Sequence, residues 1–192
     1  MIVIGVPVPK DYQIDVRTAS YCSAEANSMG GSWGFVASRD AGVGRSTFAY
    51  EALKNPDVTH LYFMDYDVVP PFGTLKKLLG HDLPIVAGVY PMLANTKVCS
   101  YKLDDDWLEW HQKDNGVIKV KCLAGSTLLV KREVLEKLSN PCFRIEYKAV
   151  GDDGRCYDEG EDEYFSRIAQ EAGYDLMVDT SIVCEHYNYG RI

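Results

Sequence analysis

The sequence predicts an α/β fold with a mixed, mostly parallel sheet flanked by helices. Stretches typical of strands and of helices alternate through the first half of the chain. The run from Leu61 to Met64 is apolar at every position, as in a strand that is buried on both faces of a parallel sheet. The chain has 192 residues and 46% of them are hydrophobic, which is enough for a substantial core. We therefore expect residues 1–192 to form a single domain.

The first half of the chain divides into apolar runs and segments with helical periodicity. Apolar runs predict strands, and apolar residues at helical spacing predict helices. Gly30-Gly31 closes the first helix, and Asn55-Pro56 ends the second. The predicted strands are Ile2–Val6, Trp33–Ser38, Leu61–Met64 and Pro84–Val89, and the predicted helices are Val16–Met29, Arg45–Leu53 and Phe72–Leu79.

The second half is less regular. Trp107–His111 and Val117–Cys122 are predicted to pair as a hairpin around the turn Asp114-Asn115-Gly116. The helix Glu161–Ala172 has the clearest apolar face in the chain, and Gly173 supplies its stop. The other predicted elements are the strands Thr127–Val130, Asp175–Val178 and Ser181–Cys184 and the helix Arg132–Leu138.

Composition argues against several classes of protein. The formal net charge of -8 disfavours a broad nucleic-acid surface, which needs clustered Lys and Arg. No apolar stretch approaches the ~20 residues that span a bilayer. Met1–Pro9 has no basic segment before its apolar run, so we expect a buried strand there and not a signal peptide. The six cysteines contain no CxxC pair, which favours reduced thiols in a cytoplasmic protein.

The most informative residues are Asp65 and Asp67, which follow the apolar run and precede Pro70-Pro71. In extended chain, side chains at positions i and i+2 point to the same side. Two carboxylates at the carboxyl end of a strand would form a hard oxygen site for a divalent cation. Ligands of open α/β sheets bind at such strand ends, so we prefer this interpretation to ordinary turn acids.

A second acidic cluster, Glu159-Gly160-Glu161-Asp162-Glu163, begins the clearest helix. Acids at this position stabilise a helix N-terminus, and that role by itself explains the presence of Glu161 or Glu163. One carboxylate can still face a cleft as a general base, and Asp162 is the candidate. The helix N-terminus favours its ionised form, which would make it a weaker base.

Three weaker signals accompany these acids. His186 follows a predicted strand and can complete an oxygen-rich Mn²⁺ site, although a lone histidine is more often structural. Gly42-Val43-Gly44-Arg45 precedes a predicted helix, as anion-binding loops do, but its glycine spacing matches no nucleotide fingerprint. Gly125 allows close backbone approach to a sugar, or simply starts a strand. Trp107, Trp110 and Tyr90 are candidates for a sugar-stacking wall or for core positions.

In this order, the motifs resemble the GT-A-fold glycosyltransferases, especially small bacterial and phage members similar to family 2. Phe63-Met64-Asp65-Tyr66-Asp67 resembles the strand that ends in the DxD motif. Residues 122–135 resemble the glycine-led strand and helix on the acceptor side, and residues 160–165 resemble the ED motif. His186 resembles the histidine that follows them.

The resemblance implies a metal-dependent transfer of a sugar from a nucleotide-diphosphate donor, with a UDP-sugar expected, to an acceptor hydroxyl. Mn²⁺ or Mg²⁺ would be the cofactor, and inversion is expected although a DxD motif does not determine stereochemistry. The implied metal ligands are Asp65, Asp67 and His186, the implied base is Asp162, the implied donor-side residues are Val6, Pro7, Arg45, Asp65 and Asp67, and the implied acceptor-side residues are Gly125 and Glu161.

Alternative functions stay open on the sequence. A non-catalytic module that binds nucleotide sugars or glycans could have the same fold. A related nucleotidyltransferase would usually carry a glycine-rich basic loop after its first strand, which Gly5–Lys10 does not match. A phosphatase of the haloacid dehalogenase type would carry its DxD motif near the N-terminus, followed by Thr. The acceptor is not identified by any motif.

Overall fold

The computed structural model describes residues 1–10, 13–92, 95–103, 107–109, 116–150, 154 and 156–187. Its centre is a seven-stranded sheet with the order β2-β1-β3-β11-β5-β14-β9. β1 is parallel to β2 and β3, and β5 is parallel to β14, whereas β11 and β9 run antiparallel to their neighbours. This confirms the predicted α/β fold with a mixed, mostly parallel sheet. The strands are β1 Ile2–Pro9, β2 Ser32–Ser38, β3 His60–Phe63, β5 Ile85–Val89, β9 Val117–Val120, β11 Leu128–Lys131 and β14 Leu176–Val183.

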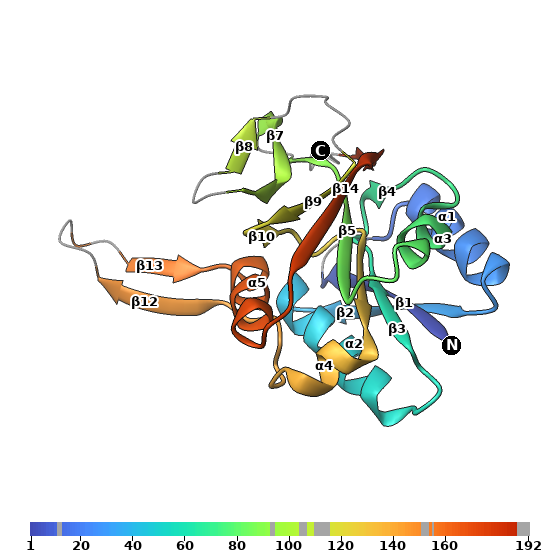
Figure 1. Ribbon diagram of the computed structural model, residues 1–192, viewed down its shortest axis with the longest axis horizontal. Helices are drawn as coiled ribbons and strands as arrows, with labels where there is room; N and C mark the ends of the chain where they lie inside the picture. Colours follow the sequence, from blue (N-terminus) through green and yellow to red (C-terminus); the bar gives the residue numbers. More distant parts are fainter. Residues whose placement is uncertain are drawn as a thin grey trace.

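Helices cover both faces of this sheet (Figure 1). α1 (Val16–Ser28) and α3 (Thr74–Gly80) contribute to one buried apolar cluster, and α2 (Ala41–Lys54), α4 (Arg132–Lys137) and α5 (Glu161–Glu171) contribute to the other. The interior strand β3 supplies alternate residues to the two clusters, Leu61 and Phe63 to one and Tyr62 to the other. This explains why its sequence is apolar throughout.

Helix α2 begins earlier than predicted. Asp40 is its N-cap and accepts a hydrogen bond from the Val43 backbone N–H at 2.9 Å, so the helix starts at Ala41. The glycines of the predicted anion-binding loop therefore lie inside the first turns. A Cβ at Gly44 would lie 2.7 Å from the Pro7 Cβ atom, so Gly44 allows the helix to pack closely against β1. A Cβ at Gly42 would lie 3.0 Å from the Glu161 Cβ atom, so Gly42 faces the start of α5 instead.

The predicted hairpin between Trp107–His111 and Val117–Cys122 is wrong in its pairing. β8 (Trp107–Glu109) pairs with β7 (Asn95–Lys102), and β9 pairs with β14 at the edge of the main sheet. The partner of β9 is thus the edge of β14, which is distant in sequence. The residues of a turn predict pairing between neighbouring strands and give no information about such a distant partner. β7 also pairs with the short strands β6 (Pro91–Met92) and β10 (Cys122–Leu123). Asp114, Asn115 and Trp110 lie outside the described residues.

A two-stranded hairpin, β12 (Glu146–Val150) and β13 (Cys156–Glu159), projects from the body of the molecule (Figure 1). This hairpin was not predicted from the sequence, because Glu146, Lys148, Asp158 and Glu159 interrupt any apolar run there. Arg167 on α5 anchors its base through ion pairs to Glu146 at 3.0 Å and Glu159 at 2.9 Å. β13 leads through Gly160 directly into α5, so the hairpin adjoins the acids at the start of that helix.

The structure also bears on the predictions about membrane spans and cysteines. The described part of the chain contains no helix with the length and apolar character that a bilayer crossing requires. Cys22, Cys122, Cys142 and Cys184 are free and buried.

Candidate functional site

A cleft of about 250 Å³ lies at the carboxyl ends of β1, β3, β5 and β14. Among the predicted site residues, Pro7, Arg45, Asp65, Asp67, Glu161, Asp162 and His186 line it. Residues that are far apart in the sequence are thus brought together at the place expected for ligands of an α/β sheet. Val6 is fully buried in the apolar core and does not line the cleft.

Asp65 and Asp67 reach the cleft from a turn and not from extended chain. β3 ends at Phe63, and the Val68 N–H donates to the Asp65 carbonyl at 3.4 Å. The expectation that i, i+2 spacing in a strand aligns the two carboxylates is therefore wrong, although both line the cleft. The Asp65 N–H donates to the Ser126 hydroxyl at 2.9 Å, which fixes the turn against the chain just before β11.

The other end of this turn is held by the C-terminal part of the chain. β4 (Val68–Val69) pairs antiparallel with β15 (Glu185–His186), and the Tyr187 N–H donates to the Asp67 carbonyl at 2.9 Å. This short pairing places His186 next to Asp67, with 3.6 Å between the His186 Nε2 and Asp67 Oδ1 atoms.

Arg45 connects the two acidic motifs. Its guanidinium, 2% exposed as a residue, donates to Asp65 at 2.6 Å, Asp162 at 3.2 Å and Glu161 at 3.3 Å. Such charge-assisted hydrogen bonds are stronger than neutral ones, especially where water is excluded. Among the residues that the structure describes, its buried Nε atom has no hydrogen-bond partner. The arginine predicted to border the nucleotide therefore lies at the centre of the carboxylate cluster.

Gly125 makes room for this cluster. A Cβ atom at this position would lie 2.5 Å from the Arg45 Cζ atom and 2.7 Å from the Asp162 Oδ1 atom. Its backbone N–H also favours the ionised form of the Asp162 carboxylate, which lowers the Asp162 pKa in part. A side chain here would displace both groups, so the glycine is required by close approach.

The environment raises the pKa of two carboxyl groups in the cluster, those of Asp65 and Asp162. Burial raises the pKa of Asp162 to about 7, and the Glu161 charge adds to this, whereas Arg45 opposes it. Burial also raises the pKa of Asp65, again against the effect of Arg45. Desolvation thus outweighs the helix N-terminus, and Asp162 is a better base near neutral pH than its position in the sequence suggests.

The side chains in the cleft match the ligands of a divalent cation only in part. The His186 Nδ1 atom bonds to the Pro91 carbonyl at 2.8 Å, which directs Nε2 toward Asp67. A carboxylate and an imidazole suit Mn²⁺. Asp65, in contrast, is engaged by Arg45. Within the described residues, no group of three or more His, Cys, Asp or Glu side chains is arranged to hold a metal ion.

The pKa of His186 reflects its contact with Asp67. Burial lowers this pKa, but the nearby Asp67 carboxylate and the bond to the Pro91 carbonyl outweigh burial, so the net pKa is raised. The proton that His186 retains would have to leave before a cation could bind at Nε2.

Some lining residues were missed or weighed only loosely on the sequence. Tyr90 is 4% exposed, lines the cleft and packs edge-to-face on His186 with ring centroids 5.2 Å apart. Pro9 lines the cleft because β1 extends beyond its predicted end at Val6, a length that the Pro7-Val8-Pro9 segment obscured. The side chain of Trp107 and all of Trp110 lie outside what the structure describes, so the proposed aromatic wall is untested there.

The fold is similar to solved structures. The crystal structure of A197 from STIV matches with a TM-score of 0.67 and 19% identity, over 97% of this chain and 85% of that one. GalNAc-T7, solved with UDP, GalNAc and Mn²⁺, matches with a TM-score of 0.55 and 11% identity, over 96% of this chain and 43% of that one. Apo UDP-glucose pyrophosphorylase matches with a TM-score of 0.47 and 10% identity, over 96% of this chain and 75% of that one.

At identities of 19% and below, the similarity shows a shared fold and nothing more. The match spans less than half of the length of GalNAc-T7. No known family model matches the sequence, and no curated protein matches it either.

Proposed function

We propose that this protein is a metal-dependent glycosyltransferase that moves a sugar from a nucleoside-diphosphate donor to an acceptor hydroxyl with inversion. The observation that carries the proposal is the convergence of Asp65, Asp67 and His186 with the Asp162 carboxylate on one cleft at the strand ends. The fold shared with GalNAc-T7, which was solved with UDP, supports a UDP-sugar as the donor.

On the donor side, Asp67 and His186, together with Asp65, would hold Mn²⁺ or Mg²⁺. The cation would supply positive charge to offset the negative charge that develops on the leaving diphosphate. Arg45 keeps the Asp65 carboxylate oriented through its 2.6 Å contact. Pro7 and Pro9 form the wall of the cleft at the end of β1, where the nucleotide would lie.

On the acceptor side, Asp162 would accept the proton of the acceptor hydroxyl as that oxygen attacks the anomeric carbon. Its raised pKa, about 7, lets the carboxylate bind this proton at neutral pH. Arg45 holds its oxygen in place through the 3.2 Å hydrogen bond. Glu161 shares the Arg45 guanidinium and stands beside the base without replacing it. Positioning of base and acceptor is then the main protein contribution to the rate.

The test is a screen of UDP- and GDP-sugars with and without Mn²⁺, in which donor binding and donor hydrolysis are measured separately. A transferase should bind a donor in a metal-dependent way and pass its sugar slowly to water. Asp67→Ala should abolish the metal-dependent binding. Binding without turnover for every donor would favour a non-catalytic module instead, and release of pyrophosphate from a nucleoside triphosphate would favour a nucleotidyltransferase.

Asp162→Asn distinguishes a base from a binding residue. This variant should retain donor binding and lose transfer by roughly 10²-fold or more. Asp158→Asn is the matched control, because Asp158 is an exposed carboxylate on β13 that does not line the cleft. Near-normal transfer in Asp162→Asn would remove Asp162 as the base.

A further inference from the structure

Tyr90 lines the cleft, and the chemistry proposed above gives it no role. It directly follows β5, whose neighbours in the sheet are β11 and β14. The Tyr90 N–H donates to the Ser100 hydroxyl at 3.1 Å, and the carbonyl of the preceding Val89 accepts the Cys184 N–H at 2.8 Å. Its ring packs edge-to-face on His186. The side chain is therefore held in place before any ligand binds, which lowers the entropic cost of a contact with a ligand.

The Tyr90 hydroxyl is a hydrogen-bond donor that other side chains leave available. The residue is 4% exposed, and among the residues that the structure describes its O–H donates to none. A phenol is protonated at neutral pH. Burial raises the pKa of this hydroxyl further, as do the Asp65 and Asp162 charges, whereas Arg45 and the Ser126 N–H lower it in part. The hydroxyl can therefore donate its proton to an oxygen atom of a ligand in the cleft.

The carboxylates near this hydroxyl belong to opposite sides of the proposed reaction. Asp65 is on the side that would hold the cation and the diphosphate, and Asp162 is the proposed base. Arg45 contacts both, at 2.6 Å and 3.2 Å, so the space between them is small. In a displacement with inversion, the transferred sugar lies between the leaving group and the attacking hydroxyl. Tyr90 therefore lies beside the position of the sugar and not beside that of the nucleoside.

Stacking of a sugar on the Tyr90 ring fits the structure less well. A stacking platform needs an open ring face. The Tyr90 ring is in contact with His186, their centroids are 5.2 Å apart, and the residue is almost completely buried. Of the two ways in which a tyrosine contacts a sugar, a hydrogen bond from the hydroxyl is therefore favoured.

We propose that Tyr90 determines which sugar is transferred, because its hydroxyl donates a hydrogen bond to one hydroxyl oxygen of the sugar in the nucleoside-diphosphate donor. This role rests on the function proposed above, since it requires such a donor in the cleft. A site that hydrogen-bonds a substrate hydroxyl rejects analogues without that hydroxyl more strongly than an apolar pocket does.

The experiment measures binding in Mn²⁺ by isothermal titration. The probes are UDP-glucose, UDP-galactose, UDP-N-acetylgalactosamine and GDP-mannose, the free nucleoside diphosphates, and the monodeoxy analogues of whichever sugar nucleotide binds most tightly. Tyr90→Phe removes the hydroxyl and keeps the ring against His186. This variant should bind the sugar nucleotide about five- to tenfold more weakly, as expected for one neutral hydrogen bond. It should bind the free nucleoside diphosphate and Mn²⁺ as the wild type does.

The monodeoxy analogues identify the sugar hydroxyl that Tyr90 contacts. For one analogue, the wild type and Tyr90→Phe should have equal affinity, because the analogue and the variant each remove one side of the same hydrogen bond. For the other analogues, the five- to tenfold difference between wild type and variant should persist, at about its original size.

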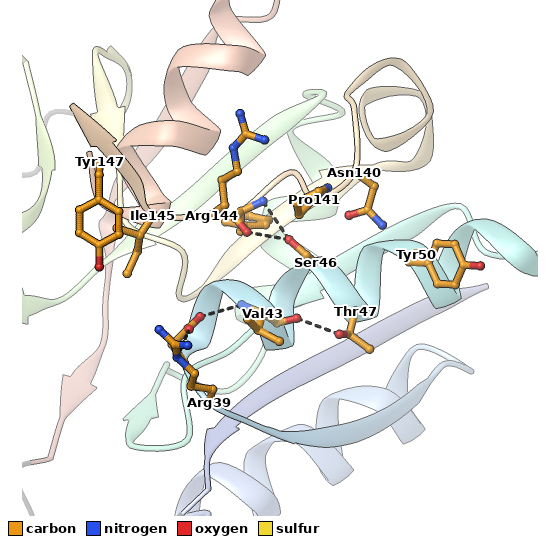
Figure 2. A pocket seen from close by; sticks show the side chains of 12 residues that line it. Arg39, Val43, Ser46, Thr47, Tyr50, Asn140, Pro141, Arg144, Ile145 and Tyr147 are labelled. Atoms are coloured by element: carbon orange, nitrogen blue, oxygen red, sulfur yellow. Dashed lines mark hydrogen bonds and ion pairs between the residues drawn. The ribbon is translucent and has the colours of Figure 1, made fainter. Parts of the chain in front are cut away.

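Tyr50→Phe and Tyr164→Phe are the matched controls. Tyr50 lies in a separate concavity of about 560 Å³ between α2 and residues 140–147 (Figure 2), and no residue that lines this concavity also lines the cleft. Tyr164 is buried to the same extent as Tyr90 but does not line the cleft. Both control variants should bind every probe as the wild type does.

The possible failures are distinguishable. Unchanged affinity of Tyr90→Phe for the sugar nucleotide would overturn the role of Tyr90 and leave the proposed function standing. An equal loss of affinity for the free nucleoside diphosphate would do the same, since the hydroxyl would then act on the nucleotide. If Tyr90→Phe does not fold, equal affinity of the wild type for the sugar nucleotide and all its monodeoxy analogues would overturn the role. No metal-dependent binding of any sugar nucleotide to the wild type would contradict the proposed function and the role of Tyr90 together.

Discussion

Replacing Gly125 by alanine should disrupt the link between the two acidic motifs without removing any functional group. The new Cβ atom would lie 2.5 Å from the Arg45 Cζ atom, 2.6 Å from its Nε atom and 2.7 Å from the Asp162 Oδ1 atom. To reach an ordinary separation of 3.4 Å, the guanidinium has to move by about 0.9 Å, the difference between 3.4 and 2.5 Å. Arg45 is almost fully buried, so this movement strains its surroundings.

The magnitude follows from the contacts that move. The hydrogen bond from Arg45 to Asp162 is 3.2 Å long, and a shift of this size would take it out of hydrogen-bond range. Overpacking of a buried site costs about 1–3 kcal/mol, so the free energy of unfolding should fall by that amount. A base misplaced by about 1 Å can cost 10²-fold in rate, so transfer should fall far more than stability.

The assay combines urea unfolding with measurements of donor binding and transfer. Gly34→Ala is the matched control, because a Cβ atom at Gly34 in β2 meets no atom within 4 Å. The control should unfold and react as the wild type does. Gly125→Ala with wild-type stability and wild-type transfer would refute the reasoning, since it would mean that the Arg45 guanidinium is not held against this backbone.

Three other outcomes are expected. At saturating Mn²⁺, transfer should rise about tenfold per pH unit up to a pH of about 7, where Asp162 becomes ionised, and then level off. A flat profile in the wild type would contradict the role of Asp162 as base. His186→Ala should weaken Mn²⁺ binding, measured by titration calorimetry, by about tenfold or more. Mn²⁺ binding to the wild type should tighten as pH rises, because the His186 proton must leave first. His60→Ala, outside the cleft, should bind Mn²⁺ as the wild type does. Asp179→Asn should lower the free energy of unfolding by about 1–3 kcal/mol, because the Asp179 side chain is 2% exposed and bonds to His81 and Ser181. Burial raises the pKa of Asp179, but its hydrogen bonds more than offset burial, so the net pKa lies below 3.8. The stabilisation by Asp179 should therefore be lost as pH falls below that value. Asp175→Asn, at an exposed ion pair, should change the free energy of unfolding by less than about 1 kcal/mol.

Local patterns were sufficient where an element is specified by its own residues. The apolar run around Leu61 predicts β3, and the apolar face that includes Phe165 and Ala169 predicts α5, because burial selects the same periodicity wherever the element packs. Local patterns do not determine which strand pairs with which. Val117–Val120 has the pattern of a strand, but its partner β14 lies far along the chain, and no local signal distinguishes that edge from a nearby hairpin.

The candidate site divides in the same way. Residue type and position after a strand or before a helix were enough to name Asp65, Asp67, Asp162 and His186 as candidates. The reason is that a carboxylate or an imidazole can bind a cation or a proton in any fold. The tertiary structure alone decided that Arg45 joins the two acidic motifs and that burial raises the pKa of Asp162 to about 7. Both depend on distances between segments that are distant in sequence and on the exclusion of water, which arise only when the chain packs.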